Sequence, residues 1–260
     1  MTRIKDSRSS SHKELLYGVQ PVHAALRHRK RQFSELYIKR GKNNSTRIRE
    51  IRKLAEELGI TLNEVPESKL SEMCPEEVHQ GVVLRCGILP FSPISILPLP
   101  VEGKLPLIVV LDQIEDPHNL GAVLRTCGFF DVNAVVVSKD HSCGLTPVVS
   151  KSSSGVSEWL PIISVTNLTR FLQKQKSEGY WIVGLAEESN QSVSQLVRDK
   201  PLILVMGNEG RGIRPLIRKQ CDWLVSIAGN PEVSSLNVSN AAAIALNHFY
   251  VLPESAEQIS

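Results

Sequence analysis

Aromatic side chains are scarce in this 260-residue sequence, and long apolar runs are absent. Phe, Trp and Tyr together make up 5% of the chain, while the hydrophobic fraction of 42% is ordinary for a globular protein. No apolar run approaches the roughly 20 residues that cross a bilayer, so we expect no membrane partner. Residues 1–12 lack the apolar stretch of a secretory signal, and we interpret them as a disordered tail.

The cysteines are few, odd in number and widely spaced. There are five, and no two of them form a Cys-x-x-Cys pair. This pattern predicts neither a zinc site nor a disulfide framework, so we expect no metal. A reducing compartment is therefore indicated, and we expect the cytoplasm, with the mitochondrion as the alternative.

Charge of one sign is concentrated in a short segment. The net charge is only +3, but residues 27–53 hold 11 basic residues against Glu35 and Glu50, a local charge of +9. The rest of the chain therefore sums to 3 − 9 = −6. Such a segment indicates a docking surface for a polyanion, most often a nucleic acid, although many charged segments are simply solvated.

Strand and helix patterns alternate along both halves of the chain. Residues 46–58 place apolar side chains at helical spacing and end before Gly59, a residue suited to a helix C-terminus. Five prolines between residues 89 and 106 indicate a semi-rigid linker. We predict a small α/β domain over residues 13–88, a linker over 89–106 and a second α/β domain over 107–260.

The second half contains two continuous apolar runs, residues 107–111 and 202–206, typical of strands buried on both faces of a parallel sheet. Further strands are expected at residues 134–137, 181–185 and 223–227. Helices are expected at residues 119–130, 146–154, 166–177, 213–219 and 239–252. Asn119 is a natural N-cap for the first of these helices.

Three predicted strand ends carry conspicuous loops, and ligands bind at the carboxyl ends of strands in such sheets. The loops are residues 112–119, 207–212 and 228–237. The second has three glycines in six residues, which allow a ligand to approach the backbone, but it lacks the spacing and the lysine of a Walker loop. The third precedes an Ala-rich helix, whose N-terminus suits an oxygen-rich ligand. Each loop alone is also compatible with ordinary caps and turns.

Taken together, the order and spacing of these loops resemble the three motifs of the SpoU/TrmH family of RNA ribose 2′-O-methyltransferases, within the SPOUT superfamily. Residues 145–155 are typical of the branch that methylates a guanosine of large-subunit rRNA in bacteria and mitochondria. Residues 17–19 and 78–82 resemble the family's ribosomal-protein-like RNA-binding domain. The matching motif segments are Asp116-Pro117-His118-Asn119-Leu120-Gly121 with Arg125-Thr126, then Gly207-Asn208-Glu209-Gly210, then Ser235-Leu236-Asn237-Val238-Ser239.

The resemblance implies a fold and a site. The fold would be a parallel-sheet SPOUT domain with a deep trefoil knot, preceded by a small α/β RNA-binding domain, in a homodimer that completes the active site. The methyl donor would be S-adenosylmethionine (AdoMet). The implied catalytic residues are Asn119, Arg125, Glu209, Ser235 and Asn237. The implied cofactor-binding residues are Met206, Gly207, Asn208, Gly210, Ile227, Gly229 and Leu236.

The role of Arg125 follows from the acidity of its side chain. A guanidinium gives up a proton with great difficulty, so positioning a phosphate and stabilising a developing alkoxide suit Arg125 better than acting as a base. The third motif departs from the family pattern, because Pro231 stands where a glycine is expected. Contacts near Gly229 are therefore less secure than those at Leu236.

Three hypotheses are compatible with these residues. The first is an AdoMet-dependent rRNA 2′-O-methyltransferase, which the basic N-terminal half favours. The second is a tRNA 2′-O-methyltransferase. The third is a non-catalytic RNA-binding factor in ribosome assembly, against which the complete set of motif residues argues.

Overall fold

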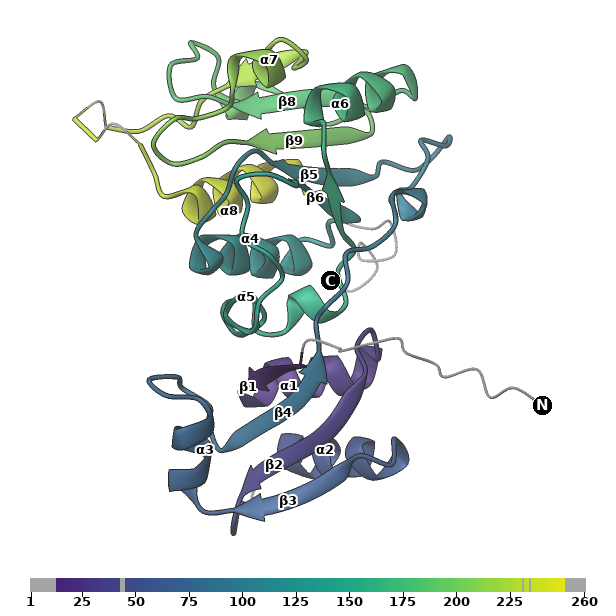
Figure 1. The fold of residues 1–260 in the computed structure, drawn as a ribbon. Helices are drawn as coiled ribbons and strands as arrows, with labels where there is room; N and C mark the ends of the chain where they lie inside the picture. The colour runs from purple at the N-terminus through teal and green to yellow at the C-terminus, as the bar shows by residue number, and fades with distance from the viewer. Residues whose placement is uncertain (1–12, 43–44, 231, 234, 251–260) are drawn as a thin grey trace, which may run out of the picture. The chain divides into compact units, whose positions relative to one another are not determined.

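The computed structural model describes residues 13–42, 45–230, 232–233 and 235–250. The predicted tail over residues 1–12 lies outside the described residues, as do Pro231 and Ser234. The chain divides into two compact units, residues 1–90 with 145–147, and residues 91–144 with 148–260 (Figure 1). Within the described residues, no helix is both long and apolar enough to cross a membrane.

The first unit is a four-stranded mixed sheet with helices on both faces. Its strand order is β1-β4-β2-β3, in which only β2 and β3 run parallel. Its core lies between the sheet and helices α1 and α2, and α3 packs on the other face over a smaller cluster. The elements are β1 (Lys13–Tyr17), α1 (Val19–His28), β2 (Phe33–Lys39), α2 (Thr46–Glu57), β3 (Thr61–Val65), α3 (Glu67–Met73) and β4 (Val82–Gly87).

Helix α2 shows how the sequence specifies this unit. Ile48, Ile51 and Ala55 recur at helical spacing and are fully or almost fully buried against the sheet. The Ser45 hydroxyl accepts a hydrogen bond from the Ile48 amide at 3.2 Å and caps the first turn. Gly59 follows the helix with φ +64°, so the predicted C-terminal glycine has the left-handed backbone expected of it.

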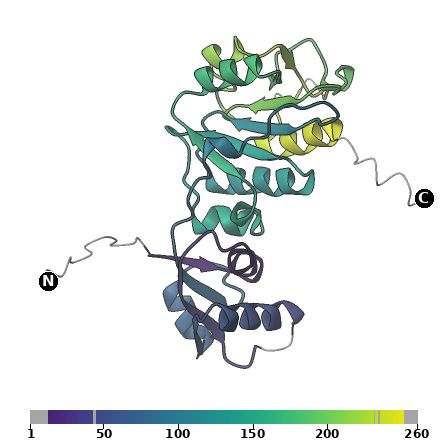
Figure 2. The same cartoon turned by 90° about the vertical axis from the view of Figure 1, so that its right-hand side faces the viewer.

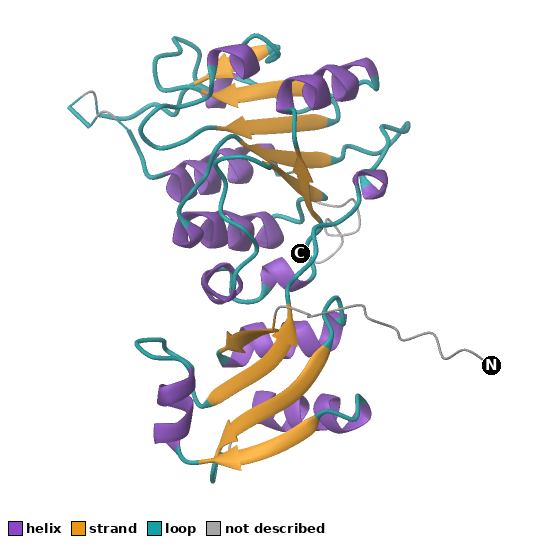
Figure 3. Cartoon of the chain, viewed as in Figure 1, coloured by secondary structure: helices purple, strands orange, loops and turns teal. Residues whose placement is uncertain are grey.

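The second unit is a six-stranded sheet in which every pairing is parallel, with the order β10-β8-β9-β5-β6-β7 (Figure 3). Every residue of β5 and β9, its two central strands, is buried. The strands are β5 (Leu107–Leu111), β6 (Ala134–Ser138), β7 (Ile162–Val165), β8 (Trp181–Leu185), β9 (Leu202–Met206) and β10 (Trp223–Val225). The helices are α4 (Pro117–Phe129), α5 (Pro147–Ser152), α6 (Leu168–Ser177), α7 (Pro215–Arg218) and α8 (Val238–Phe249).

Helices cover this sheet on both faces. One face packs Ile108, Val110, Ile203 and Val205 against α6 and α7 in a single apolar cluster. Helices α4 and α8 lie side by side on the other face (Figures 1 and 2). The alternating side chains of buried strands thus find helices on both sides, which is why the two central runs are apolar throughout.

Helix α4 begins two residues earlier than predicted, and Asn119 is not its N-cap. Pro117 occupies the first helical position, where its missing N–H is not needed. Asp116 is the N-cap, and its carboxylate accepts from the His118 amide at 2.9 Å. The amide side chain of Asn119 is therefore free of capping and available for another partner.

The Pro-rich segment after the first unit packs against the second unit instead of hanging free. The Ser92 amide donates to the Ile162 carbonyl at 2.7 Å, and the Tyr180 hydroxyl donates to the Pro98 carbonyl at 2.6 Å. Leu97 packs against the α6 side of the sheet core. Burial raises the pKa of Tyr180 to about 12, so the hydroxyl remains a donor throughout the physiological range.

Candidate active site

The three loops predicted to form the site meet at the carboxyl edge of the second sheet. Residues 112–116 follow β5, residues 207–214 follow β9 and residues 226–237 follow β10. Because all six strands run in one direction, these ends share one edge of the sheet. Side-chain hydrogen bonds then connect the loops directly.

Asn237 connects all three loops. Its Nδ2 donates to the Asn119 Oδ1 at 3.0 Å and also to the Glu209 carboxylate. Its Oδ1 accepts from the Ser239 amide at 2.9 Å, so Asn237 also caps α8. The Glu209 carboxylate also accepts a hydrogen bond from the backbone amide of Val238 at 3.2 Å. Both ends of the Asn237 amide are thus engaged, which fixes its orientation at the start of α8.

Arg125 does not join this cluster within one chain. It lies six residues after Asn119 on α4, which is about 240° around the helix and about 9 Å along it. Its side chain is exposed and makes no hydrogen bond or ion pair with the described residues. It lines a separate hollow with Phe129, Trp159 and Ala243. The single chain therefore unites three of the five predicted catalytic residues.

A cavity of about 1020 Å³ opens beside the Asn237 cluster, which is ample for a small-molecule site of about 300–1,000 Å³. All seven predicted cofactor residues line it. Ser235 and Glu209 line it as well. Its apolar walls include Ile244 of α8, which is 43% exposed in the chain. The seven are Met206, Gly207, Asn208, Gly210, Ile227, Gly229 and Leu236.

Sequence reasoning missed one wall of this cavity. Residues 185–188, at the end of β8, line it, and so does Arg218, whose guanidinium pairs with Glu188. Strand β8 lies between β9 and β10, so its carboxyl end had to open onto the same cavity. The strand itself was predicted, but its place in the sheet was not, since strand order cannot be read from local patterns.

The loop after β9 is folded tightly back on itself. A Cβ atom at Gly207 would lie 2.1 Å from the Gly212 carbonyl carbon, so no other residue fits there. The Gly212 amide donates to the Asn208 carbonyl at 2.8 Å and closes the turn. Gly207 and Gly212 thus allow the two ends of the loop to come into backbone contact, and both residues line the cavity.

The five cysteines add no nucleophile to the site. None of them forms a disulfide. Burial raises the pKa of Cys143 to about 11 and of Cys221 to about 12, and it also raises the pKa of the fully buried Cys127. The thiolate forms of these three cysteines are therefore scarce at neutral pH. The described residues contain no group of three or more His, Cys, Asp or Glu side chains that could hold a metal ion.

The basic segment of the first unit is less positive than its sequence alone indicates. Acidic residues from other parts of the unit pair with it: Glu14 with Arg31 at 2.9 Å and Glu64 with Arg52 at 2.6 Å. Arg27, Arg29 and Arg40 are exposed and make no ion pair among the described residues. These three, hereafter the free arginines, remain as candidate phosphate contacts.

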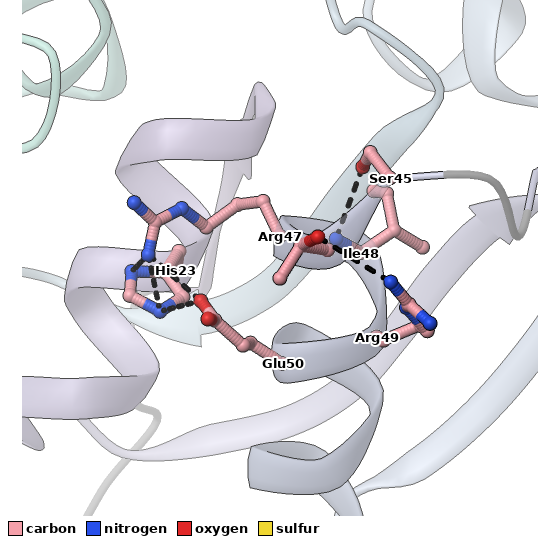
Figure 4. A network of polar contacts seen from close by, with 7 residues as sticks. His23, Ser45, Arg47, Ile48, Arg49 and Glu50 are labelled. Atoms are coloured by element: carbon pink, nitrogen blue, oxygen red, sulfur yellow. Dashed lines mark hydrogen bonds and ion pairs between the residues drawn. The ribbon is translucent and has the colours of Figure 1, made fainter.

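Part of the segment forms a polar network at the start of α2 (Figure 4). One nitrogen of Arg47 lies 2.8 Å from the Glu50 carboxylate and 3.2 Å from Nε2 of His23. His23 also approaches Glu50 at 3.1 Å. Burial lowers the pKa of His23, and the positive charge of Arg47 lowers it further, so the ring is neutral at physiological pH. This network joins α1 to α2. Because Arg47 is already paired with Glu50, it is a weaker candidate for a phosphate contact than the free arginines.

Comparison with known proteins identifies the family. The profile described as the SpoU rRNA Methylase family matches residues 106–247, more than half of the chain. The chain belongs to the SpoU rRNA Methylase family. A second profile, described as RNA 2′-O ribose methyltransferase substrate binding, matches residues 15–91. The predicted family and the predicted pairing of a small N-terminal unit with a parallel-sheet unit are thus confirmed.

Full-length relatives share both units. The chain is 38% identical over 245 residues to the 23S rRNA (guanosine-2′-O-)-methyltransferase RlmB of Pseudomonas putida, covering 90% of this chain and 94% of the relative. It is 39% identical over 235 residues to RlmB of Pseudomonas aeruginosa, with 90% and 94% covered. The SpoU methyltransferase AviRb of Streptomyces viridochromogenes, solved with AdoMet, has the same fold, with a TM-score of 0.75, 24% identity, and 91% and 88% covered.

Proposed function

We propose that this SpoU-family protein transfers a methyl group from AdoMet to the ribose 2′-hydroxyl of a guanosine in large-subunit rRNA. One observation carries the proposal: 38–39% identity to RlmB proteins extends over 90% of the chain and therefore over both units. A tRNA substrate is the nearest alternative. A binding factor without activity is disfavoured because Asn119, Glu209 and Asn237 are still hydrogen-bonded as a cluster beside the cavity.

The cavity fits the proposed donor in size and in chemistry. Ile227, Leu236 and Ile244 offer apolar walls to an adenine ring, and Gly207 and Gly229 leave the backbone open to polar contacts. No lysine of the described residues lines it, and of the two arginines that do, Arg211 and Arg218, the second is paired with Glu188. The glycine-rich loop after β9 lacks the spacing of a phosphate-binding loop. Such a site suits a nucleoside that carries an amino-acid group better than a nucleoside triphosphate.

Bound AdoMet would supply an electrophilic methyl group, and the side chains of the chain would prepare the acceptor. A ribose hydroxyl is a poor nucleophile, so it must be polarised as it attacks. Asn119, Glu209 and Asn237 present amide and carboxylate groups already held by one another. Ser235 lies at the cavity wall, where its hydroxyl can contact donor or acceptor. Arg125 would hold the phosphate and stabilise the developing alkoxide.

Because Arg125 lies away from Asn237 in the single chain, the proposal includes a homodimer in which each site takes Arg125 from the partner subunit. Phe129 of α4 is 80% exposed, and it lines the same hollow as Arg125 and as Ala243 of α8. A two-fold interface over this hollow would cover Phe129 and bring each Arg125 toward the opposite α8. We also propose that the second unit contains the deep trefoil knot that the resemblance implies.

The free arginines of the first unit would contact rRNA phosphates, consistent with the substrate-binding profile that matches this unit. Since the relatives named above are bacterial, we place the reaction in the cytoplasm, with the mitochondrion as the alternative compartment.

The direct test is transfer of tritiated methyl groups from AdoMet to unmodified RNA. Label in large-subunit rRNA, at a ribose of guanosine after nuclease digestion, is the expected result. Label only in tRNA would replace the proposed substrate by the alternative. No label in either RNA, with folded protein and intact AdoMet binding, would favour the binding factor.

The shared site is tested by subunit complementation. Arg125→Ala and Asn237→Ala homodimers are expected to be inactive. Mixing, unfolding and refolding the two variants should restore up to about one quarter of wild-type activity, because half of the dimers are then mixed and each holds one complete site. Activity that stays at background in the mixture, with dimers present by light scattering, would contradict the shared site.

A further inference from the structure

The carboxylate of Asp112 is the most deeply buried charge near the cavity. Asp112 follows β5, and its side chain has no exposed surface. Its backbone amide donates to the Met206 carbonyl at 2.8 Å, which continues the pairing of β5 with β9 by one residue. A carboxylate in such a place costs several kcal/mol unless it is paired and hydrogen-bonded.

Arg214 satisfies this carboxylate with three N–H groups. Its backbone amide lies 3.0 Å from Oδ2, its Nε lies 2.8 Å from Oδ1 and its Nη2 lies 2.6 Å from Oδ1. A guanidinium with a fixed fork of donors is suited to this arrangement, whereas an ammonium group can reproduce only part of it. Arg214 is also the residue that precedes α7. The far end of the loop after β9 is therefore fixed to the end of β5.

The near end of the same loop is fixed to the next residue of the β5 loop. The Asn208 Nδ2 donates to the Gln113 carbonyl at 3.0 Å, and the Gln113 amide donates to the Ser138 hydroxyl at 3.3 Å. Gln113 has φ +63°, a backbone conformation that non-glycine residues rarely adopt and that this double contact maintains. Two consecutive residues, Asp112 and Gln113, thus hold both ends of residues 208–214.

Between those ends lies much of the candidate site. Residues 207–213 line the cavity, and Glu209 lies in the same loop, bonded to Asn237. Asp112 and Arg214 are not among the cavity residues, so they have no direct access to a donor molecule there. Any effect they exert on binding must pass through the position of the loop.

We propose that Asp112 and Arg214 are positioning residues for the methyl donor: their buried ion pair holds residues 208–213 in the shape that binds AdoMet and presents Glu209. The inference rests on the proposed function for its ligand. The ion pair orders the loop before any ligand binds, so less conformational entropy is lost when AdoMet binds.

Arg214→Gln, Arg214→Lys and Asp112→Asn test the pair in the full-length protein. Arg214→Gln removes the guanidinium and keeps the backbone hydrogen bond. Ile213, buried in the sheet core, still anchors the chain next to it. We expect AdoMet binding, measured by calorimetry, to weaken at least about tenfold in Arg214→Gln and Asp112→Asn, which is the scale of one missing charge-assisted hydrogen bond. Arg214→Lys should fall in between.

A stability-matched control separates positioning from simple loss of fold. Ile162→Ala opens a hole beside β7, at the opposite edge of the sheet from β10 and outside the apolar cluster that contains Ile213, and should lower the melting temperature without changing AdoMet affinity. In steady state, the KM for AdoMet should rise in the Arg214 variants while the KM for RNA stays the same. Equal losses of affinity in Ile162→Ala and Arg214→Gln would overturn the proposal.

Hydrogen exchange gives a reading that needs no ligand. Amides of residues 208–213 should exchange faster in Arg214→Gln than in the wild type, and those of α6 should not change. Unchanged protection of the loop would overturn the inference whatever the protein binds. If the wild type failed to bind AdoMet while the loop amides responded as expected, the proposed function would fall and the positioning role would stand.

Discussion

The two units use their charged residues in opposite ways. In the first unit, most acids and bases pair at the surface between neighbouring elements, as Arg52 does with Glu64 and Lys39 with Glu67. In the second unit, the informative charges lie at the end of a buried parallel sheet, where Asp112 is fully enclosed and Glu209 holds Asn237. Exposed pairs contribute at most about 1 kcal/mol each, whereas a buried charge requires its partner. Apart from the buried Arg31, substitutions of charged residues should therefore have small, additive effects in the first unit and large local effects in the second.

The largest expected effect is at Arg125. Arg125→Ala should lower the rate of methyl transfer by about 10²–10³-fold or more, because a preorganised cation is removed from the place where charge develops. AdoMet affinity should stay within about twofold, since the cavity does not include Arg125. The matched control is Lys174→Ala, an exposed residue of α6, which should keep full activity. Turnover retained in Arg125→Ala would refute its assignment.

Gly207→Ala should have the next largest effect. The new methyl group would meet the Gly212 backbone at 2.1 Å, so the loop must move away from its place in the cavity. We expect at least a tenfold loss of AdoMet affinity by calorimetry, with the fold kept by circular dichroism. Gly144→Ala is the control, because a Cβ atom there meets nothing within 4 Å and its φ is not positive. Equal affinities of the two variants would show that the loop adapts freely.

The free arginines of the first unit should contribute modestly to RNA affinity, and their contribution should depend on the salt concentration. Replacing Arg27, Arg29 and Arg40 by Gln should lower the slope of log affinity against log salt by about 0.7–0.9 for each phosphate that the variant no longer neutralises. Binding of a large-subunit rRNA fragment measures this between low and physiological salt. Arg52→Gln should change the slope less, because Glu64 already neutralises Arg52. A slope that stays the same in the triple variant would place the RNA elsewhere.

The smallest effect concerns pH. Burial and Arg47 lower the pKa of His23 in the folded protein, so the unfolded chain binds the proton more readily. Stability from this source is present above the unfolded pKa of about 6.5 and is lost as pH falls from there through the lower folded pKa. His23→Gln should remove that part of the dependence.

The three tryptophans, all in the second unit, give a control for the pH experiment. Thermal unfolding followed by far-ultraviolet circular dichroism should show the pH effect of His23, whereas tryptophan fluorescence should not. An equal shift in both signals would contradict the expectation that the pH effect of His23 is confined to the first unit.

Element prediction succeeded where the pattern was local and strong. The runs of β5 and β9 are apolar at every position, and both strands lie where the sequence indicated. Strand β7 was missed because its Ile162 and Ile163 are too short a run after Pro161, and only pairing with β6 makes it a strand.

The candidate site divides in the same way. By itself, the sequence determined the family, the two α/β units and seven of the residues that line the cavity, because spaced motifs and strand-end loops are local properties of the chain. Tertiary structure decided that β8 supplies a fourth wall, that Asn119 bonds Asn237 instead of capping α4, and that Arg125 lies apart from both. Strand order and the partner of Asn119 depend on contacts between segments that are distant in the chain, which no local pattern contains. The start of α4, by contrast, is set locally by Asp116 and Pro117.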